Sequence, residues 1–184
     1  MASTRKPDDR PASLADAFPP HAYVPGLRPR PRHLQGDARE PPPAPLDPEA
    51  WRDSPAYVRG IELFEHGYYW EAHEAWEGLW IAAGRKGPVA ELLRGLILLA
   101  AAGVKIRQGR GTGAATLGAR ARGCFERVRQ QHGTQLAGVV LEELLAFADH
   151  VQAEAPTLPG APEADVAVVF GRRLRSGTGF EASS

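Results

Sequence analysis

Proline residues are distributed unevenly along this chain, because twelve of the 17 prolines lie within the first fifty residues. Tracts such as RPRPR and PPPAP do not form regular helices, since proline lacks a backbone N–H and fixes φ. We therefore predict that residues 1–46 form an extended or disordered proline-rich arm. We expect this arm to lie over its own domain rather than to bind a proline-recognising groove. Residues 47–155 are predicted to form a helical domain and residues 156–184 a C-terminal tail.

After the arm, apolar residues recur at helical spacing, and proline or glycine marks the borders of each helical segment. The chain is therefore predicted to be all-α, a compact bundle of about five helices built from two helical hairpins. The helices are expected near residues 55–66, 69–83, 88–109, 114–131 and 134–153. The third is apolar on nearly every side and should be the most enclosed. In the tail, EADVAVVFGRRLR is expected to dock on the domain, and SGTGFEASS to be disordered.

Composition excludes several classes of function. The 22 basic and 22 acidic residues balance, so no nucleic-acid partner is expected. The longest apolar run, Leu96–Val104, has about half the length that a bilayer crossing requires. The N-terminus has no apolar run typical of a signal peptide, and the single cysteine, Cys124, is predicted to lie in the core of a cytoplasmic protein. Few lysines together with abundant alanine and glycine indicate a bacterial source.

The stretch YYWEAHEAWEGLW, residues 68–80, contains the clearest candidate site. An apolar stripe is expected along one face of its helix, formed by Tyr69, Ala72, Trp76, Leu79 and Trp80. His73 lies at the edge of that stripe with Glu77 one turn further on, while Glu71 and Glu74 are expected to face solvent. An imidazole and a carboxylate at this spacing suit a divalent ion such as zinc, manganese or iron. Two ligands do not complete a site, and the available further donors are Glu62, Glu65, His66, Glu74 and Glu91.

The same stretch contains the pattern HExxE, which lacks the second histidine of the HExxH metalloprotease motif. With a metal bound, Glu74 is the candidate general base of a hydrolase-like enzyme. Without a metal this role has no chemical basis. The sequence therefore leaves open whether the chain is an enzyme and names no substrate.

An alternative interpretation needs no metal. Arg94 interrupts an apolar helix, and a buried arginine is rarely left without a carboxylate. If Arg94 pairs with Glu77 or Glu74, His73 becomes a bridge in a structural polar network. The chain would then be a non-enzymatic helical-hairpin scaffold that binds a protein partner or a second copy of itself. A turn resembling that of tetratricopeptide repeats favours this alternative, and the tryptophans of residues 68–80 are expected to be core rather than a ligand pocket.

YVRGIELFEHGYYWEAHEAWEGLW and LLRGLILLAAAGVKIRQGRGTGA together resemble a bacterial and archaeal family, domain of unknown function 309, over residues 57–128. The family pattern is a histidine, a glutamate four positions later and an aromatic residue three beyond that, here His73, Glu77 and Trp80. One departure is Leu98, where the family commonly has glutamine. The resemblance implies a compact all-helical domain and metal binding by the histidine and glutamate. It implies no substrate and no reaction.

Overall fold

The computed structural model describes residues 18–27 and 42–174 and confirms the predicted all-α class. Its five α-helices are α1 (Pro55–Glu65), α2 (Tyr69–Ala82), α3 (Gly87–Arg107), α4 (Gly111–His132) and α5 (Leu141–Glu154). Short 3-10 helices precede α1 and follow α5, namely η3 (Trp51–Asp53) and η4 (Ala155–Thr157). In the described part of the chain, no helix combines the length and the hydropathy of a membrane span.

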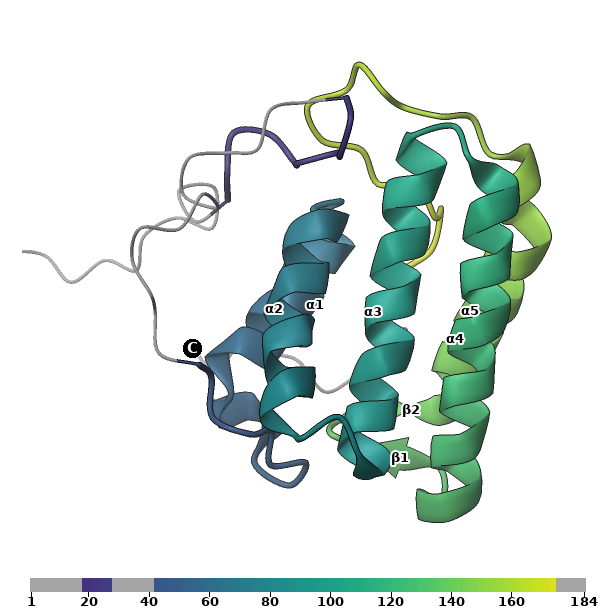
Figure 1. Ribbon diagram of the computed structural model, residues 1–184. Helices are drawn as coiled ribbons and strands as arrows, with labels where there is room; N and C mark the ends of the chain where they lie inside the picture. The colour runs from purple at the N-terminus through teal and green to yellow at the C-terminus, as the bar shows by residue number, and fades with distance from the viewer. Residues whose placement is uncertain (1–17, 28–41, 175–184) are drawn as a thin grey trace, which may run out of the picture.

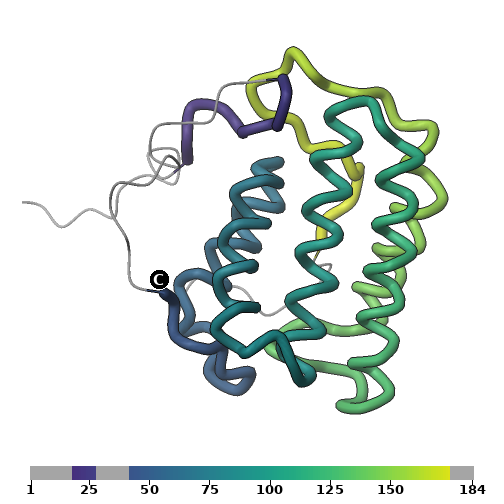
Figure 2. Tube along the Cα trace, viewed as in Figure 1, coloured from purple at the N-terminus to yellow at the C-terminus, as the bar shows by residue number. Residues whose placement is uncertain are grey.

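Consecutive helices run antiparallel, and each packs against the next in the sequence (Figure 1). Helix α3 lies between α2 and α4, and α4 packs on α5, so α3 has helical neighbours on two sides. Figure 2 shows the same order along the Cα trace. This position explains why α3 is apolar on most of its surface, as the sequence predicts.

Glycine allows α1 and α2 to form a tight hairpin. Gly67 has φ of +86°, a conformation that residues with a Cβ rarely adopt. The N–H of Tyr68 then donates to the carbonyl of Leu63 at 2.9 Å, which closes the end of α1. Helix α2 begins at the next residue, Tyr69. The predicted border between the first two helices is therefore confirmed.

The predicted start of the fifth helix at Thr134 is wrong. A two-stranded antiparallel hairpin precedes α5, with β1 (Gln135–Leu136) paired to β2 (Val139–Val140). Ala137 and Gly138, between the strands, both have positive φ, as a type I′ turn requires. The hydroxyl of Tyr57 donates to the carbonyl of Ala137 at 3.0 Å. This hydrogen bond joins residues far apart in the sequence and stabilises the turn relative to a helix that continues through these residues.

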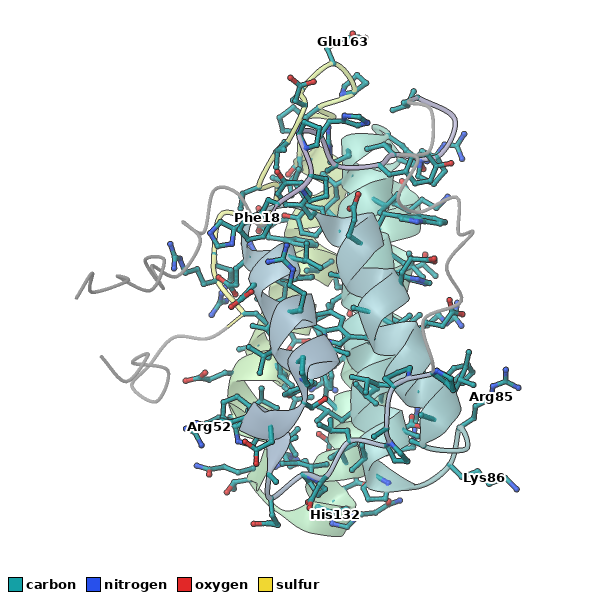
Figure 3. All side chains as sticks on the ribbon, turned by 90° about the vertical axis from the view of Figure 1, so that its left-hand side faces the viewer. Phe18, Arg52, Arg85, Lys86, His132 and Glu163 are labelled. Carbon is teal, nitrogen blue, oxygen red and sulfur yellow. The ribbon has the colours of Figure 1, made fainter. Side chains whose placement is uncertain are left out.

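Residues 18–27, which we call the strap, pack on the helical domain at the end where α2 begins and α3 ends (Figure 1). Ala22 and Val24 are both 1% exposed. In Figure 3, Phe18 of the strap lies toward the end of the molecule opposite His132. The remainder of the arm before residue 42 lies outside the described residues.

The tail also belongs to the domain core. Phe170 and Leu174 are each 2% exposed, and the N–H of Val169 donates to the hydroxyl of Tyr69 at 3.0 Å. Among the described tail residues beyond η4 there is no strand, although VAVVF has a strand-like composition. SGTGFEASS, predicted to be disordered, lies outside the described residues.

Candidate metal centre

Helix α2 carries the candidate ligands next to its buried face. Tyr69, Ala72, Trp76 and Leu79 are at most 1% exposed, which confirms the predicted apolar stripe for these four residues. Trp80, at the end of the stripe, is only partly buried, and the Arg85 guanidinium lies 5.2 Å from the centre of its ring. The burial of the stripe fixes the rotation of α2 and so fixes where His73 points.

Three side chains of α2 converge beside this stripe. His73, Glu74 and Glu77 each offer one ligand atom, and these atoms lie within 4.8 Å of one another. Nδ1 of His73 is 3.9 Å from Oε1 of Glu74 and 4.0 Å from Oε2 of Glu77. These distances are too long for hydrogen bonds. They are slightly wider than the separation of neighbouring ligands around an ion with bonds of about 2.0–2.2 Å.

The His73 imidazole is held in a partly dry environment. Its side chain is 23% exposed, compared with 34% for Glu74 and 44% for Glu77. Nδ1 itself is buried and has no hydrogen-bond partner within the described ranges 18–27 and 42–174. The ring stacks on Trp70, with centroids 5.8 Å apart and planes 14° apart. A buried ring nitrogen without a partner is uncommon, and a bound ion or water would satisfy it.

The other candidate donors, on α1 and at its C-cap, are engaged elsewhere. Glu62 receives a hydrogen bond from Arg59 at 3.3 Å, and Nδ1 of His66 lies 2.7 Å from the backbone carbonyl of Glu62. Glu65 accepts the N–H of Leu174 at 2.6 Å and therefore anchors the tail. The donor that the structure brings to His73 and Glu77 is thus Glu74, from the same helix.

Glu91 is also separate from the cluster. It accepts a hydrogen bond from Nε of Arg127 at 2.9 Å and a second from the same guanidinium. Burial alone would raise the pKa of Glu91, but hydrogen bonds from Arg127 and Cys124 hold it below the ordinary value. Glu91 therefore links α3 to α4 as a charged carboxylate.

The prediction that Arg94 is buried is wrong, because its side chain is exposed. Its charge acts on Glu91 and Cys124, which places it toward the side of α3 that faces α4. Within the described residues it makes no ion pair with Glu77. Half a turn of helix, about two residues, separates an inward position from an outward one. An apolar run as long as that of α3 does not reveal which side its arginine occupies.

Among the described residues, the buried arginine is Arg107, which is 1% exposed at the end of α3. It donates to the backbone carbonyl of Ala161 at 3.2 Å and to that of Ala164. These acceptors belong to the tail, more than fifty positions away. The sequence did not reveal that Arg107 is buried. Basic residues are common in the last turn of a helix, where they usually face solvent, and Arg107 stands at such a position.

Glu71, predicted to face solvent, is 6% exposed. Its Oε1 accepts the N–H of Tyr23 at 2.8 Å, so the strap covers this side of α2. The helical period alone placed Glu71 outside the apolar stripe correctly. What it could not show is that the arm returns to bury that position.

Cys124 lies in the core as predicted, with 2% exposure. Burial raises the pKa of its thiol to about 11, and the neighbouring Glu91 carboxylate adds to this effect, while Arg127 and Arg94 oppose it. Because the thiolate is the reactive form, we expect modification at pH 8 to be about a hundredfold slower in the folded protein than in denaturant. Absorbance after addition of an aromatic disulfide measures both rates. Equal rates would contradict the placement of Cys124.

Residues 57–117 match the family described as Domain of unknown function (DUF309), which confirms the resemblance. The matched segment runs from the first turns of α1 into α4 and includes all three residues of the cluster on α2. No curated protein and no solved structure matches the chain. Residues 57–117 of this chain are therefore similar to the DUF309 family, and the match covers α2 and α3 completely.

Proposed function

We propose that the domain binds one divalent metal ion through His73, Glu74 and Glu77. The observation that carries this proposal is the buried Nδ1 of His73, which has no hydrogen-bond partner among the described residues and lies about equally far from two carboxylate oxygens. A neutral imidazole that meets two carboxylates supplies one nitrogen and two oxygen donors. This donor set matches zinc, manganese or ferrous iron better than calcium or cuprous copper.

An ion held by His73, Glu74 and Glu77 would leave room for a further ligand and would supply Lewis acidity to it. The protein's own contribution is to hold the three donors on a single rigid helix. The side chains of Glu74 and Glu77 are 34% and 44% exposed, so the carboxylate side of the cluster faces solvent, whereas Nδ1 of His73 is buried.

The role of Glu74 decides whether this centre extends to hydrolysis. As the third ligand, Glu74 completes the donor set but is no longer a separate general base. As a base, it leaves His73 and Glu77 as the only protein ligands of the cluster. Its position 3.9 Å from Nδ1 of His73 supports the ligand role, so we propose metal binding and leave catalysis as a prediction from sequence.

The alternative is a scaffold whose helices are docked by a polar network of His73, Glu77 and Arg94. This alternative has less support, because Arg94 is exposed and its charge acts on Glu91 and Cys124. The network would then lack the cation that bridges its members.

The test is elemental analysis of untagged protein, followed by calorimetric titration of metal-free protein with zinc, manganese and ferrous iron. We expect about one ion per chain for one of these metals. Loss of a ligand in His73→Ala or Glu77→Gln should weaken binding at least about a hundredfold, since loss of a group that only hydrogen-bonds to a ligand already costs about ten- to a hundredfold. Glu74→Gln should weaken binding similarly if Glu74 is a ligand, and should leave affinity unchanged if it is a base.

The matched controls are His132→Ala and Glu142→Gln, which change the same residue types at exposed positions away from α2. Both should bind metal as the unmodified protein does. Absence of stoichiometric metal would refute the proposal, and so would an equal loss of binding in the controls. Unchanged binding in His73→Ala and Glu77→Gln would also refute it.

A further inference from the structure

The strap makes specific contacts with the start of α2, the same helix that carries the proposed ligands. The backbone N–H of Tyr23 donates to Glu71 at 2.8 Å, and the hydroxyl of Tyr68 donates to the carbonyl of Pro19 at 2.8 Å. The side-chain amide of Gln108, at the end of α3, donates to the carbonyl of Pro25 at 2.9 Å. The strap therefore has one defined register on the domain.

Tyr23 connects the strap to the metal centre through a column of three rings. Its ring meets Trp70 edge-on, with centroids 5.1 Å apart and planes 89° apart. Trp70 in turn stacks on the His73 imidazole. The indole N–H of Trp70 is buried and has no hydrogen-bond partner in the parts of the chain that the structure describes. The orientation of the indole therefore depends on packing with its neighbours.

We propose that Tyr23 is a positioning residue of the metal centre. Its ring holds Trp70 against the imidazole, and this contact keeps Nδ1 of His73 facing Glu74 and Glu77. The inference rests on the proposed metal function. It adds a component that lies some fifty positions before the ligands and outside the segment that matches the family.

In this arrangement, metal binding and docking of the strap each change the equilibrium of the other. If the docked strap favours the imidazole orientation that binds metal, then bound metal must favour the docked strap by the same factor. The contribution of one aromatic pair corresponds to about a two- to tenfold change in affinity. Hydrogen exchange of the Tyr23 amide, which is bonded to Glu71, reports strap docking directly.

The experiment compares zinc titrations of the full chain with Tyr23→Ala and Tyr23→Phe. We expect about two- to tenfold weaker binding in Tyr23→Ala. Tyr23→Phe retains the ring that contacts Trp70 and should bind as the unmodified protein does. A second control is Phe18→Ala, which removes another strap ring that stacks on Tyr68, with centroids 5.2 Å apart, rather than on Trp70. Its effect should be smaller than that of Tyr23→Ala.

Two further measurements separate positioning from general stability. The ring protons of His73 are expected to move downfield in metal-free Tyr23→Ala, because stacking on the indole weakens. Saturating zinc should slow amide exchange in the strap of the unmodified protein, but not in His73→Ala. Unchanged zinc affinity and unchanged imidazole shifts in Tyr23→Ala would overturn this inference alone, as would an equal loss in Phe18→Ala. Failure of the unmodified chain to bind any of the three metals would overturn the proposed function as well.

Discussion

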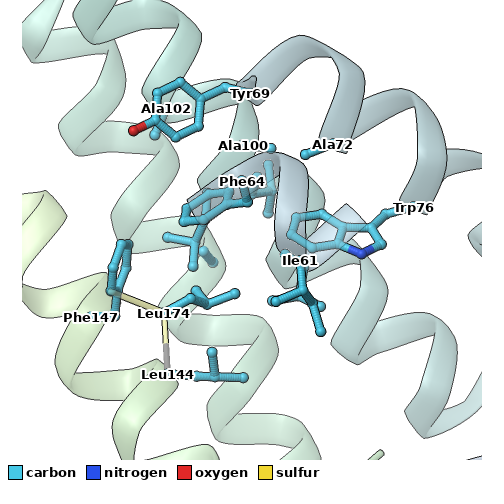
Figure 4. Packing of buried hydrophobic residues seen from close by; sticks show 14 of the residues in the cluster. Ile61, Phe64, Tyr69, Ala72, Trp76, Ala100, Ala102, Leu144, Phe147 and Leu174 are labelled. Atoms are coloured by element: carbon cyan, nitrogen blue, oxygen red, sulfur yellow. The ribbon is translucent and has the colours of Figure 1, made fainter. Parts of the chain in front are cut away.

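Replacement of Trp76 by alanine is expected to lower the free energy of unfolding by about 3–5 kcal/mol. Trp76 is completely buried, and its indole N–H lies 3.4 Å from the carbonyl of Tyr57. Figure 4 shows the ring beside Ile61 and Ala72 in the core. Gly60 of α1 lies against the same ring, since a Cβ at that position would come within 2.2 Å of Nε1. A cavity at this contact would weaken the packing of α1 on α2.

Equilibrium unfolding in urea, followed by far-ultraviolet circular dichroism, measures this change. Trp80→Ala is the matched control, because Trp80 lies on the same helix but is only partly buried. Its loss of stability should be clearly smaller. A loss of less than about 1 kcal/mol in Trp76→Ala would contradict the assignment of this tryptophan to the core rather than to a ligand pocket.

Phe170→Ala is expected to destabilise the domain by a similar amount, about 3–5 kcal/mol. The ring stacks on Phe64, with centroids 5.5 Å apart and planes 13° apart. It also contacts Tyr69 and Phe147, in each case with centroids 5.2 Å apart. Three aromatic neighbours from α1, α2 and α5 thus enclose a residue of the tail. The tail should therefore behave as an integral part of the fold.

The same urea titration tests this prediction, with Val168→Ala as the control. Val168 is two positions away but 59% exposed, so its replacement should change stability by no more than about 0.5 kcal/mol. If Phe170→Ala were as mild as the control, the tail would contribute little to the core. A large loss of stability in Phe170→Ala would mean that the segment matched by the family, which ends at residue 117, needs the tail to complete its core.

Local patterns predicted most of the secondary structure. The borders of α1, α2 and α3 follow from proline and glycine positions, which act within a few residues of themselves. The hairpin before α5 was missed because its pattern, LAGVV, is short and can also be read as one turn of an apolar helix. Its turn is stabilised by Tyr57, which lies 80 positions earlier.

The pair His73 and Glu77 could be selected from sequence because helical geometry alone places residues i and i+4 on one face. The third donor, Glu74, could not be assigned in this way. An adjacent residue points about 100° away around the helix, and only its side-chain rotamer brings the carboxylate within 3.9 Å of the imidazole. The burial of Nδ1 and its stacking on Trp70 are likewise absent from any linear pattern.

By itself, the sequence determined the all-α class, the helix order, the apolar stripe of α2 and the histidine–glutamate pair. These features depend on the helical period and on local backbone preferences, which each short segment expresses on its own. Only the tertiary structure decided that Arg107 rather than Arg94 is buried, that the strap covers Glu71 and that Tyr23 reaches the ring beside His73. Those outcomes depend on contacts between segments that are distant in the sequence. The free energy of such a contact depends on which two surfaces pack together, and that is known only from the folded structure.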